Sequence, residues 1–292
     1  MAPIDVPHSP RVVIYHQTHY QGNDFVSLLP LITEGEENVG VTHVIIAALH
    51  INDLPGNITL NDDPPDHSKF DRLWEEVALF QDIGVKVLCM IGGAAQGSFQ
   101  RLDGDDMQFE QFYAPVRNVI HRHGFNGVDL DVEEEMSLGG IVRLIDRLKA
   151  DFGDDFLITL APVATALQGL PHLSGFDYEA LEVMRGRKIA WYNTQFYNNW
   201  GFLQDLNAYH LILARGFPID KVVVGVLTNP GLGNGYIEFD HLQTILSTLW
   251  TKRFGGLMGW EFFSSKPGDV QRPWEWAHGI SKQFQGLQNS PR

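Results

Sequence analysis

The sequence predicts a single (β/α)8 TIM barrel, a fold of the α/β class. Short apolar runs rich in Val and Ile recur every few tens of residues, and amphipathic segments with helical periodicity lie between them. Eight such strand–helix units in 292 residues match the count and the size of this barrel. A doubly wound open sheet is the alternative, because sequence alone does not show that a sheet closes.

The predicted elements follow in order along the chain. A first strand is predicted at 11–16 (RVVIYH) and a second at 41–49 (VTHVIIAAL), where β-branched residues are dense. A helix at 70–83 leads to a third strand at 85–91 (VKVLCMI), and a helix at 109–123 leads to a fourth at 127–132 (GVDLDV). The segment 54–68, rich in Pro, Asn and Asp, is predicted to be a long loop that helps to shape an active site.

The second half of the chain repeats this alternation. A helix at 141–152 precedes strands at 156–160 (FLITL) and 189–196 (IAWYNTQF). Helices at 209–216 and 239–251 precede strands at 221–227 (KVVVGVL) and 256–260 (GLMGW). No linker or low-complexity tract divides the chain, so residues 1–292 are predicted to form one domain with flexible segments at 1–10 and 286–292.

Composition narrows the choice of partner. The net charge is −15 with only 21 Lys and Arg, so a phosphate backbone would be repelled and nucleic acid is not expected. Aromatic residues make up 11% of the chain, including seven Trp, and apolar ring faces can hold sugars without charge. An uncharged carbohydrate is therefore the expected partner, and the oligomeric state is left open.

Cellular location is constrained only weakly. No stretch reaches transmembrane length, so no membrane partner is expected, and the N-terminal residues lack the apolar centre of a signal peptide. Both a cytoplasmic protein and an extracellular one whose signal peptide has been removed fit this pattern. The sequon Asn57-Ile58-Thr59 favours the extracellular location. Cys89, the only cysteine, lies in an apolar strand, where a buried inert thiol is expected.

The fourth predicted strand carries a row of carboxylates. Asp129, Asp131 and Glu133 alternate with apolar residues, and side chains two positions apart share one face of a strand. Buried like charges cannot all ionise normally, so at least one of the three should hold a proton near neutral pH, as a general acid requires. A solvated acidic face on an edge strand is the alternative. Glu134 and Glu135, which follow, are expected to be solvated loop residues.

Two further strand ends carry candidate binding groups. The strand at 189–196 brings Gln195 to its end and runs on into Tyr197 and Asn198, whose donors suit a substrate with carbonyl and hydroxyl groups. Trp260 ends the last strand, where its ring could form the apolar floor of a sugar subsite. Packing in the core is the alternative for these aromatic side chains.

No metal site and no cofactor are predicted. The pair His16 and His19 lacks the helical setting and the third ligand of a zinc site. The glycine-rich segment 231–235 lacks the spacing of a dinucleotide-binding loop and is interpreted as a turn. Chelation of a hard cation by the carboxylate row is the remaining metal hypothesis.

The segment NGVDLDVE at 126–133 resembles the DGxDxDxE signature of glycoside hydrolase family 18, which contains chitinases and endo-β-N-acetylglucosaminidases. Ile91-Gly92-Gly93 is similar to the end of that family's SxGG strand, the segment 195–199 to its strand-six motif, and Trp260 to its strand-eight Trp. The resemblance covers essentially the whole chain. It is greatest to fungal endo-β-N-acetylglucosaminidases and runs through segments such as 50–63 and 161–175. It implies retaining hydrolysis in which the 2-acetamido oxygen of the substrate, not an enzyme nucleophile, attacks the anomeric carbon.

The resemblance also implies roles for individual residues. Glu133 would protonate the leaving oxygen and later activate water, Asp131 would orient the acetamide, and Asp129 would help to fix the protonation of Asp131. Tyr197 would hold the acetamide carbonyl. The candidates for substrate binding are Trp260, Gln195, Asn198, Gly92 and Gly93.

Two positions depart from the family pattern. Asn126 stands where the family has its first Asp, and Met90 stands where it has Ser, and both are expected to lie behind the acid as a drier support. The function expected from the resemblance is cleavage of the GlcNAc–GlcNAc core of N-linked glycans. A chitinase acting on linear polymers and a non-catalytic carbohydrate-binding protein are the alternatives, because subsite loops choose the substrate.

Overall fold

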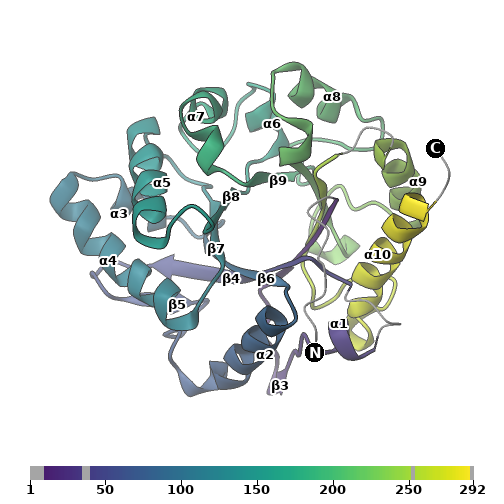
Figure 1. The fold of residues 1–292 in the computed structure, drawn as a ribbon, viewed down its shortest axis with the longest axis horizontal. Coiled ribbons are helices and arrows are strands. Elements are labelled where there is room, and N and C mark those ends of the chain that lie inside the picture. Colours follow the sequence, from purple (N-terminus) through teal and green to yellow (C-terminus); the bar gives the residue numbers. More distant parts are fainter. Residues whose placement is uncertain (1–9, 35–39, 251–253, 290–292) are drawn as a thin grey trace.

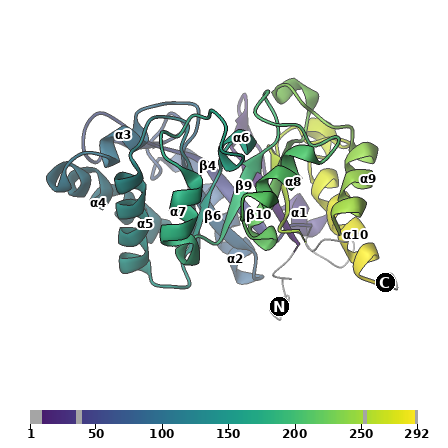
Figure 2. The ribbon, with the colours of Figure 1, turned by 90° about the horizontal axis from the view of Figure 1, so that it is seen from above.

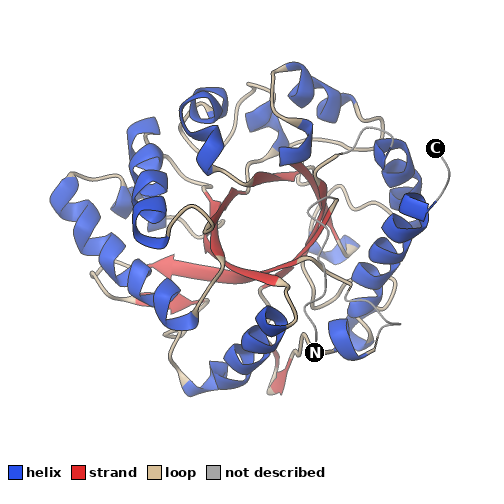
Figure 3. Cartoon of the chain, in the orientation of Figure 1, coloured by secondary structure: helices blue, strands red, loops and turns tan. Residues whose placement is uncertain are grey.

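Parallel strands close into a barrel with helices packed around it (Figures 1 and 3). The structure is a computed structural model and describes residues 10–34, 40–250 and 254–289. The first strand pairs in parallel with both the second barrel strand and the last, which closes the ring. The predicted TIM barrel is therefore confirmed, and the open-sheet alternative is wrong.

All eight predicted strands are present, with ends that differ by at most two residues. The barrel strands are β1 (Arg11–His16), β4 (His43–Ile51), β6 (Lys86–Gly92), β7 (Gly127–Asp131), β8 (Leu157–Leu160), β9 (Trp191–Gln195), β10 (Val222–Leu227) and β11 (Gly256–Trp260). A short antiparallel pair, β2 (Tyr20–Gln21) and β3 (Asp24–Phe25), lies outside the barrel sheet.

The predicted helices are also present. The α-helices in the described residues are α1 (Pro30–Thr33), α2 (Asp71–Asp82), α3 (Ser98–Leu102), α4 (Asp106–His123), α5 (Leu138–Phe152), α6 (Ala164–Leu167), α7 (Tyr178–Arg185), α8 (Asn207–Ala214), α9 (Phe239–Trp250) and α10 (Trp274–Asn289), and several 3-10 turns lie between them. Of the ends expected to be flexible, 1–9 and 290–292 lie outside the described residues, and 286–289 belong to α10.

Local sequence explains where the two longest helices on one side of the barrel begin and end. Asp105 precedes α4 and its carboxylate accepts a hydrogen bond from the backbone N–H of Gln108, while Gly124 ends the helix at a φ of 64°. Ser137 caps α5 in the same way by accepting from Gly140 N–H. Each cap satisfies a backbone donor that the helix leaves unpaired.

The segment 54–68 contains a strand that was not predicted. Residues Ile58–Leu60 form β5, which pairs antiparallel with the far end of β4, from Leu49 to Ile51. Figure 3 shows β4 extending beyond the ring of strands, so that its end is free to accept this partner. The expectation of a structureless loop is therefore wrong at these three residues, because a tertiary partner outweighed the turn-forming composition around them.

The core has two layers, as the alternation of strand side chains requires. Between strands and helices lies a large apolar cluster that includes Val128, Leu130 and Cys89. Inside the barrel lies a smaller cluster that includes Tyr15, Met90 and Trp191. Figure 2 shows the barrel from the side, with α3 and α6 at the end where the strands finish, and this end carries the site described next.

Candidate active site

The carboxylate row lies on the inner face of β7. Asp129 and Asp131 are buried in the strand, 0% and 6% exposed, and Glu133 follows two residues beyond its end, where it is half-buried. Val128 and Leu130 face the outer apolar cluster, as the alternation predicts. The row therefore runs from the barrel interior to its mouth, and the edge-strand alternative is wrong because β7 pairs with strands on both sides.

Asp129 sits deepest and is fully supplied with hydrogen-bond donors. The hydroxyl of Tyr15 donates to Asp129 Oδ2 at 2.6 Å, and the hydroxyl of Thr159 donates to Oδ1 at 2.5 Å. The Asn193 amide donates to Oδ1 at 2.9 Å. Burial raises the pKa of Asp129, and the three hydrogen bonds offset part of this rise.

Gln195 connects the other two carboxyl groups. Its amide nitrogen lies 3.2 Å from Asp131 Oδ1 and 3.2 Å from Glu133 Oε1, and it also donates to the Ala161 carbonyl oxygen at 2.8 Å. The three acceptors lie at or just beyond the ends of the neighbouring strands β7 and β8, so one buried amide fixes their spacing. Gln195 was predicted as a binding residue, and its position between the carboxylates gives it a second task.

The two outer carboxyl groups both have raised pKa values. Burial raises the pKa of Asp131 well above its ordinary value, and the charges of Glu133 and Asp129 raise it further. Burial also raises the pKa of Glu133, against the hydrogen bonds from Gln195 and Asp131. The expectation that the row holds a proton near neutral pH agrees with these directions, and such a site can donate a proton to a bound substrate.

A pocket of about 230 Å³ opens over Asp131 and Glu133. It brings together every predicted site residue except Asp129, which lies beneath it. The predicted residues that line it are Asp131, Glu133, Gln195, Tyr197, Asn198, Trp260, Gly92 and Gly93, and the others are Gln17, Ala48, His50, Met90, Ala94 and Ala95.

The predicted binding residues differ in how they contribute. Gly92 and Gly93 have φ angles of 95° and 86°, and a Cβ on Gly92 would lie 2.5 Å from the Asp131 carbonyl oxygen, so glycine lets this turn approach β7. Tyr197 is buried beside the carboxylates. Burial raises its pKa most, and the charges of the carboxylates raise it further. Trp260 packs edge-on against Tyr15, with ring centroids 5.3 Å apart.

Asn198 has a structural contact as well as a place in the pocket. Its side-chain oxygen accepts a hydrogen bond from the backbone N–H of Asn234 at 2.9 Å, and its backbone N–H donates to the backbone carbonyl oxygen of Asn234 at 2.8 Å. The pocket wall after β9 is thereby joined to the loop after β10. The glycine-rich segment 231–235, interpreted as a turn from sequence, is this loop.

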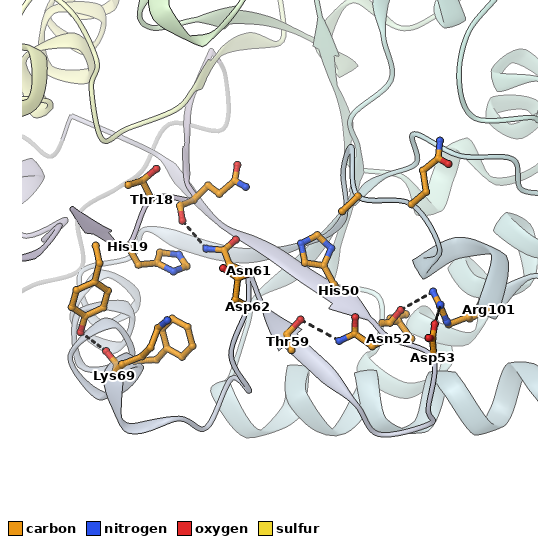
Figure 4. Close-up of a pocket in the computed structure, with 16 residues that line it drawn as sticks. Thr18, His19, His50, Asn52, Asp53, Thr59, Asn61, Asp62, Lys69 and Arg101 are labelled. Carbon is orange, nitrogen blue, oxygen red and sulfur yellow. Dashed lines mark hydrogen bonds and ion pairs between the residues drawn. The ribbon is translucent and has the colours of Figure 1, made fainter. Parts of the chain in front are cut away.

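A second, larger pocket adjoins the first. It measures about 680 Å³ and shares Gln17, His50 and Ala95 with the pocket over the carboxylates. Figure 4 shows its lining, with side chains contributed by β4 and β5 and by the segments after β1, β4, β5 and β6. The two pockets therefore lie next to each other, and together they are called the groove below.

The larger pocket is polar but offers little net charge. Arg101 forms an ion pair with Asp53, as Figure 4 shows, and Lys69 forms one with Asp63, which lies outside the lining. Both cations of the lining are therefore paired with a carboxylate. The other labelled groups are amides, hydroxyls, imidazoles and one further carboxylate, among them Thr18, His50, Asn52, Thr59, Asn61 and Asp62. This surface suits a ligand that presents many hydroxyl groups.

Two expectations about neighbouring residues are wrong. Glu134 is not solvated: it is 3% exposed, and its carboxylate accepts from Gly97 N–H at 2.7 Å and Phe99 N–H at 2.8 Å. Asn126 does not lie behind the acid, because its side-chain oxygen accepts from Val87 N–H at the opposite end of β7. Met90 does face the barrel interior, in register with Asp129.

Sequence reasoning missed the three donors to Asp129. Tyr15, Thr159 and Asn193 each lie on a strand that was predicted, and Asn193 stands two residues before Gln195 on the same face. Counting inward from each strand end in steps of two would have marked them as interior polar residues. Which carboxylate they contact depends on strand register, and Thr159 pairs with Asp129 between β8 and β7.

Comparison with known proteins identifies the family. Residues 11–229 match the model of the glycosyl hydrolases family 18. The chain belongs to glycoside hydrolase family 18. It is a glycoside hydrolase, and its substrate class is carbohydrate.

Two solved structures are similar over 94% of this chain. A chitinase, ChiC, from Aspergillus fumigatus is 55% identical, is covered over 99% of its length and superposes with a TM-score of 0.85. A fungal endo-β-N-acetylglucosaminidase of family 18 is 47% identical, is covered over 98% of its length and has a TM-score of 0.90. Among characterised sequences, Endochitinase 4 of Metarhizium robertsii is 24% identical, with 77% of each chain covered.

Within the described ranges, no group of three or more His, Cys, Asp or Glu side chains is arranged to hold a metal ion. None of the helices described for this chain is long and apolar enough to span a bilayer.

Proposed function

We propose that this family 18 enzyme is an endo-β-N-acetylglucosaminidase that hydrolyses the β-1,4 bond of the GlcNAc–GlcNAc core of N-linked glycans. The observation that carries the proposal is the groove, in which a small pocket over Asp131 and Glu133 adjoins a pocket about three times as large. The small pocket suits the one sugar whose bond is cleaved. The large one suits the branched mannose-rich part of such a glycan.

The reaction proposed is retaining and assisted by the substrate. Glu133 at the mouth protonates the leaving glycosidic oxygen, and the 2-acetamido oxygen of the bound sugar attacks the anomeric carbon. Asp131 holds the acetamide N–H during the attack, and Tyr197 holds the acetamide carbonyl. Glu133 then activates the water that opens the cyclic intermediate and returns the enzyme to its starting state.

The apolar and backbone groups of the small pocket complete the subsite. Trp260 is proposed to lie under the sugar ring, and its edge-on contact with Tyr15 holds the indole in place. Gly92 and Gly93 bring backbone rather than side chains to the pocket wall, which leaves space for the acetamide group. Asn198 is proposed to donate from its amide to a sugar hydroxyl.

A chitinase is the second candidate, and the names of similar proteins favour it: the 55% identical structure from Aspergillus fumigatus is described as a chitinase, and the relative from Metarhizium robertsii is an endochitinase. The same carboxylates would serve either reaction. What favours the N-glycan is the polar breadth of the larger pocket, since a linear chain fills a narrow groove. A non-catalytic binding protein is disfavoured, because the whole carboxylate row is present and the pKa values of Asp131 and Glu133 are raised, as a proton donor requires.

The proposal is tested by treating a high-mannose glycoprotein and chitin oligosaccharides side by side and analysing the products by mass spectrometry. We expect release of the glycan with a single N-acetylglucosamine left on asparagine. Efficient cleavage of chitin with no deglycosylation would make the protein a chitinase.

Replacing Glu133 with Gln separates catalysis from binding. The amide keeps the shape of the side chain but has no proton to give, so turnover should fall by about 10²–10⁴-fold. Binding of the glycan, measured by calorimetry on the same variant, should be largely retained. If wild-type protein binds glycans but cleaves no β-1,4-linked N-acetylglucosamine substrate, the binding-protein interpretation is correct.

A further inference from the structure

The barrel interior below the active site contains a hydrogen-bonded chain that ends on Asp129. The Trp191 indole N–H donates to Asn193 Oδ1 at 2.9 Å, and the Asn193 amide nitrogen donates to Asp129 Oδ1 at 2.9 Å. Trp191 and Asn193 lie two residues apart on the inner face of β9. Both are buried, at 2% and 0% exposure, and neither lines a pocket of the groove.

The indole ring is held on two sides at the closed end of the barrel. The Arg11 guanidinium lies 4.6 Å from the ring centroid of Trp191, and the His43 ring packs edge-on against it with centroids 4.6 Å apart. Such contacts fix the direction in which the N–H points. Trp191 is thus a rigid donor aimed at one end of the Asn193 amide.

That contact decides which end of the amide faces Asp129. A side-chain amide has an accepting oxygen and a donating nitrogen, and either end could be turned toward the carboxylate. With the oxygen occupied by the indole N–H, the nitrogen faces Asp129 and completes a set of three donors with Tyr15 and Thr159. A set made only of donors favours the ionised carboxylate.

Met90 explains why Asp129 depends on these three donors. This residue is in register with Asp129 on the neighbouring strand β6 and lies inside the barrel, but its thioether has no hydrogen to donate. The donors to Asp129 come instead from β1, β8 and β9. Loss of one of them leaves the buried carboxylate under-supplied, with no donor on the β6 side to replace it.

We infer that Trp191 is a positioning residue for hydrolysis: by orienting the Asn193 amide it keeps Asp129 an ionised acceptor beneath Asp131. This inference rests on the proposed function only in that Asp131 and Glu133 carry out the reaction. If the Asn193 amide turned, its oxygen would face Asp129, and only a protonated Asp129 could bond to it. The negative charge under Asp131 would then be lost.

The test compares Trp191→Phe with Asn193→Leu on whichever β-1,4-linked N-acetylglucosamine substrate the wild-type protein cleaves. Trp191→Phe keeps an aromatic ring and removes only the N–H and some volume. We expect kcat to fall about tenfold with little change in KM. The basic limb of kcat/KM should move to lower pH, because an uncharged Asp129 no longer raises the pKa of Asp131.

The double variant tests the route of the effect. Since both residues act through one amide, Trp191→Phe added to Asn193→Leu should cause no further loss. Trp276→Phe is the matched control, because this Trp is equally buried but lies on α10 outside the barrel, and it should leave the pH profile unchanged. Equal effects of Trp191→Phe and Trp276→Phe, or additive effects in the double variant, would overturn the inference.

A measurement without turnover separates this inference from the proposed function. Carboxyl ¹³C NMR on protein labelled at Asp, assigned with Asp129→Asn, follows the titration of Asp129 directly. Trp191→Phe should move its midpoint to higher pH. An unchanged midpoint overturns the inference even if the enzyme proves to cleave N-glycans, and a raised midpoint supports it even if the preferred substrate is chitin.

Discussion

At the level of single residues, Gln195 lowers the pKa of both members of the carboxyl pair. Its amide donates to both Asp131 and Glu133, which lowers the pKa of each against the effect of burial. A general acid must hold its proton, so kcat/KM should fall as the pH rises through the raised pKa of the pair. The pH range of activity should therefore change when this amide is removed, although burial and the neighbouring charges also set it.

Replacing Gln195 with Met should move the basic limb of kcat/KM upward by about 0.5–1 pH unit, because removing a donor to the ionised form raises the pKa. Gln111→Met, on the exposed face of α4, is the control and should leave the limb in place. A limb that stays in place or moves downward in Gln195→Met would show that Gln195 does not stabilise the ionised pair.

Residue-level prediction from the sequence succeeded where local pattern suffices. The alternation of β7 placed Asp129, Asp131 and Glu133 on one face without any knowledge of the other strands. It could not place Tyr15 or Thr159 beside Asp129, since their meeting depends on the register of strands far apart in the chain. Contacts across the barrel are a property of closure rather than of any segment.

At the level of elements, Glu134 joins the segment after β7 to the start of α3. Its carboxylate is the acceptor for Gly97 N–H and Phe99 N–H, two backbone donors that would otherwise be unpaired. The neighbouring Glu133 is held in place by the same connection. One glutamate in a row of acidic residues can therefore be buried and accept backbone hydrogen bonds. No local sequence pattern distinguishes it from its exposed neighbour.

Replacing Glu134 with Ala should lower the free energy of unfolding by about 1–3 kcal/mol, because two backbone donors lose their partner in a buried setting. Urea denaturation measures this directly. Glu135→Ala is the matched control: its side chain is exposed, and the change should be within about 0.5 kcal/mol. Similar losses for both variants would contradict the assignment of the cap to Glu134.

The strand β5 shows the same limit of prediction for elements. Ile58-Thr59-Leu60 is too short to be distinguished from a loop among Pro, Asn and Asp residues. It becomes a strand because β4 extends past the ring and offers it an edge. The eight barrel strands were predictable because each is a longer apolar run that is buried whatever its neighbours are.

For the whole molecule, the change of stability with pH should depend on two buried histidines, one at the end of β1 and one three residues beyond it. His16 and His19 are 0% and 3% exposed, and burial lowers the pKa of His16 well below its usual range and that of His19 to about 4. Both ring nitrogens of His16 lack a hydrogen-bond partner among the described residues. The fold thus holds these imidazoles neutral.

The unfolded chain takes up protons at pH values where the folded chain does not. Stability from these groups is therefore complete above about pH 6.5 and is lost as the pH falls toward 4. The active-site carboxyl groups, whose pKa values are raised, change the stability with pH in the opposite direction. The contribution of the histidines is therefore measured as a difference in stability between the wild type and a variant.

His16→Met should flatten the acid dependence of stability. We expect the wild type to lose about 1 kcal/mol or more relative to this variant between pH 6.5 and 4.5, as measured by urea unfolding at each pH. His121→Met, at an exposed site on α4, is the control and should leave the wild-type slope unchanged. Parallel curves for wild type and His16→Met would contradict a neutral buried His16.

The central claim for the molecule is that the carboxylate row delivers one proton to the leaving oxygen while the substrate's own acetamide attacks, at the core bond of an N-linked glycan. Proton NMR of a high-mannose glycopeptide during the first minutes of hydrolysis tests both parts at once. We expect cleavage between the two core N-acetylglucosamines with the β-anomer formed first. Initial formation of the α-anomer, or no cleavage of a glycopeptide by enzyme that degrades chitin oligosaccharides, would contradict it.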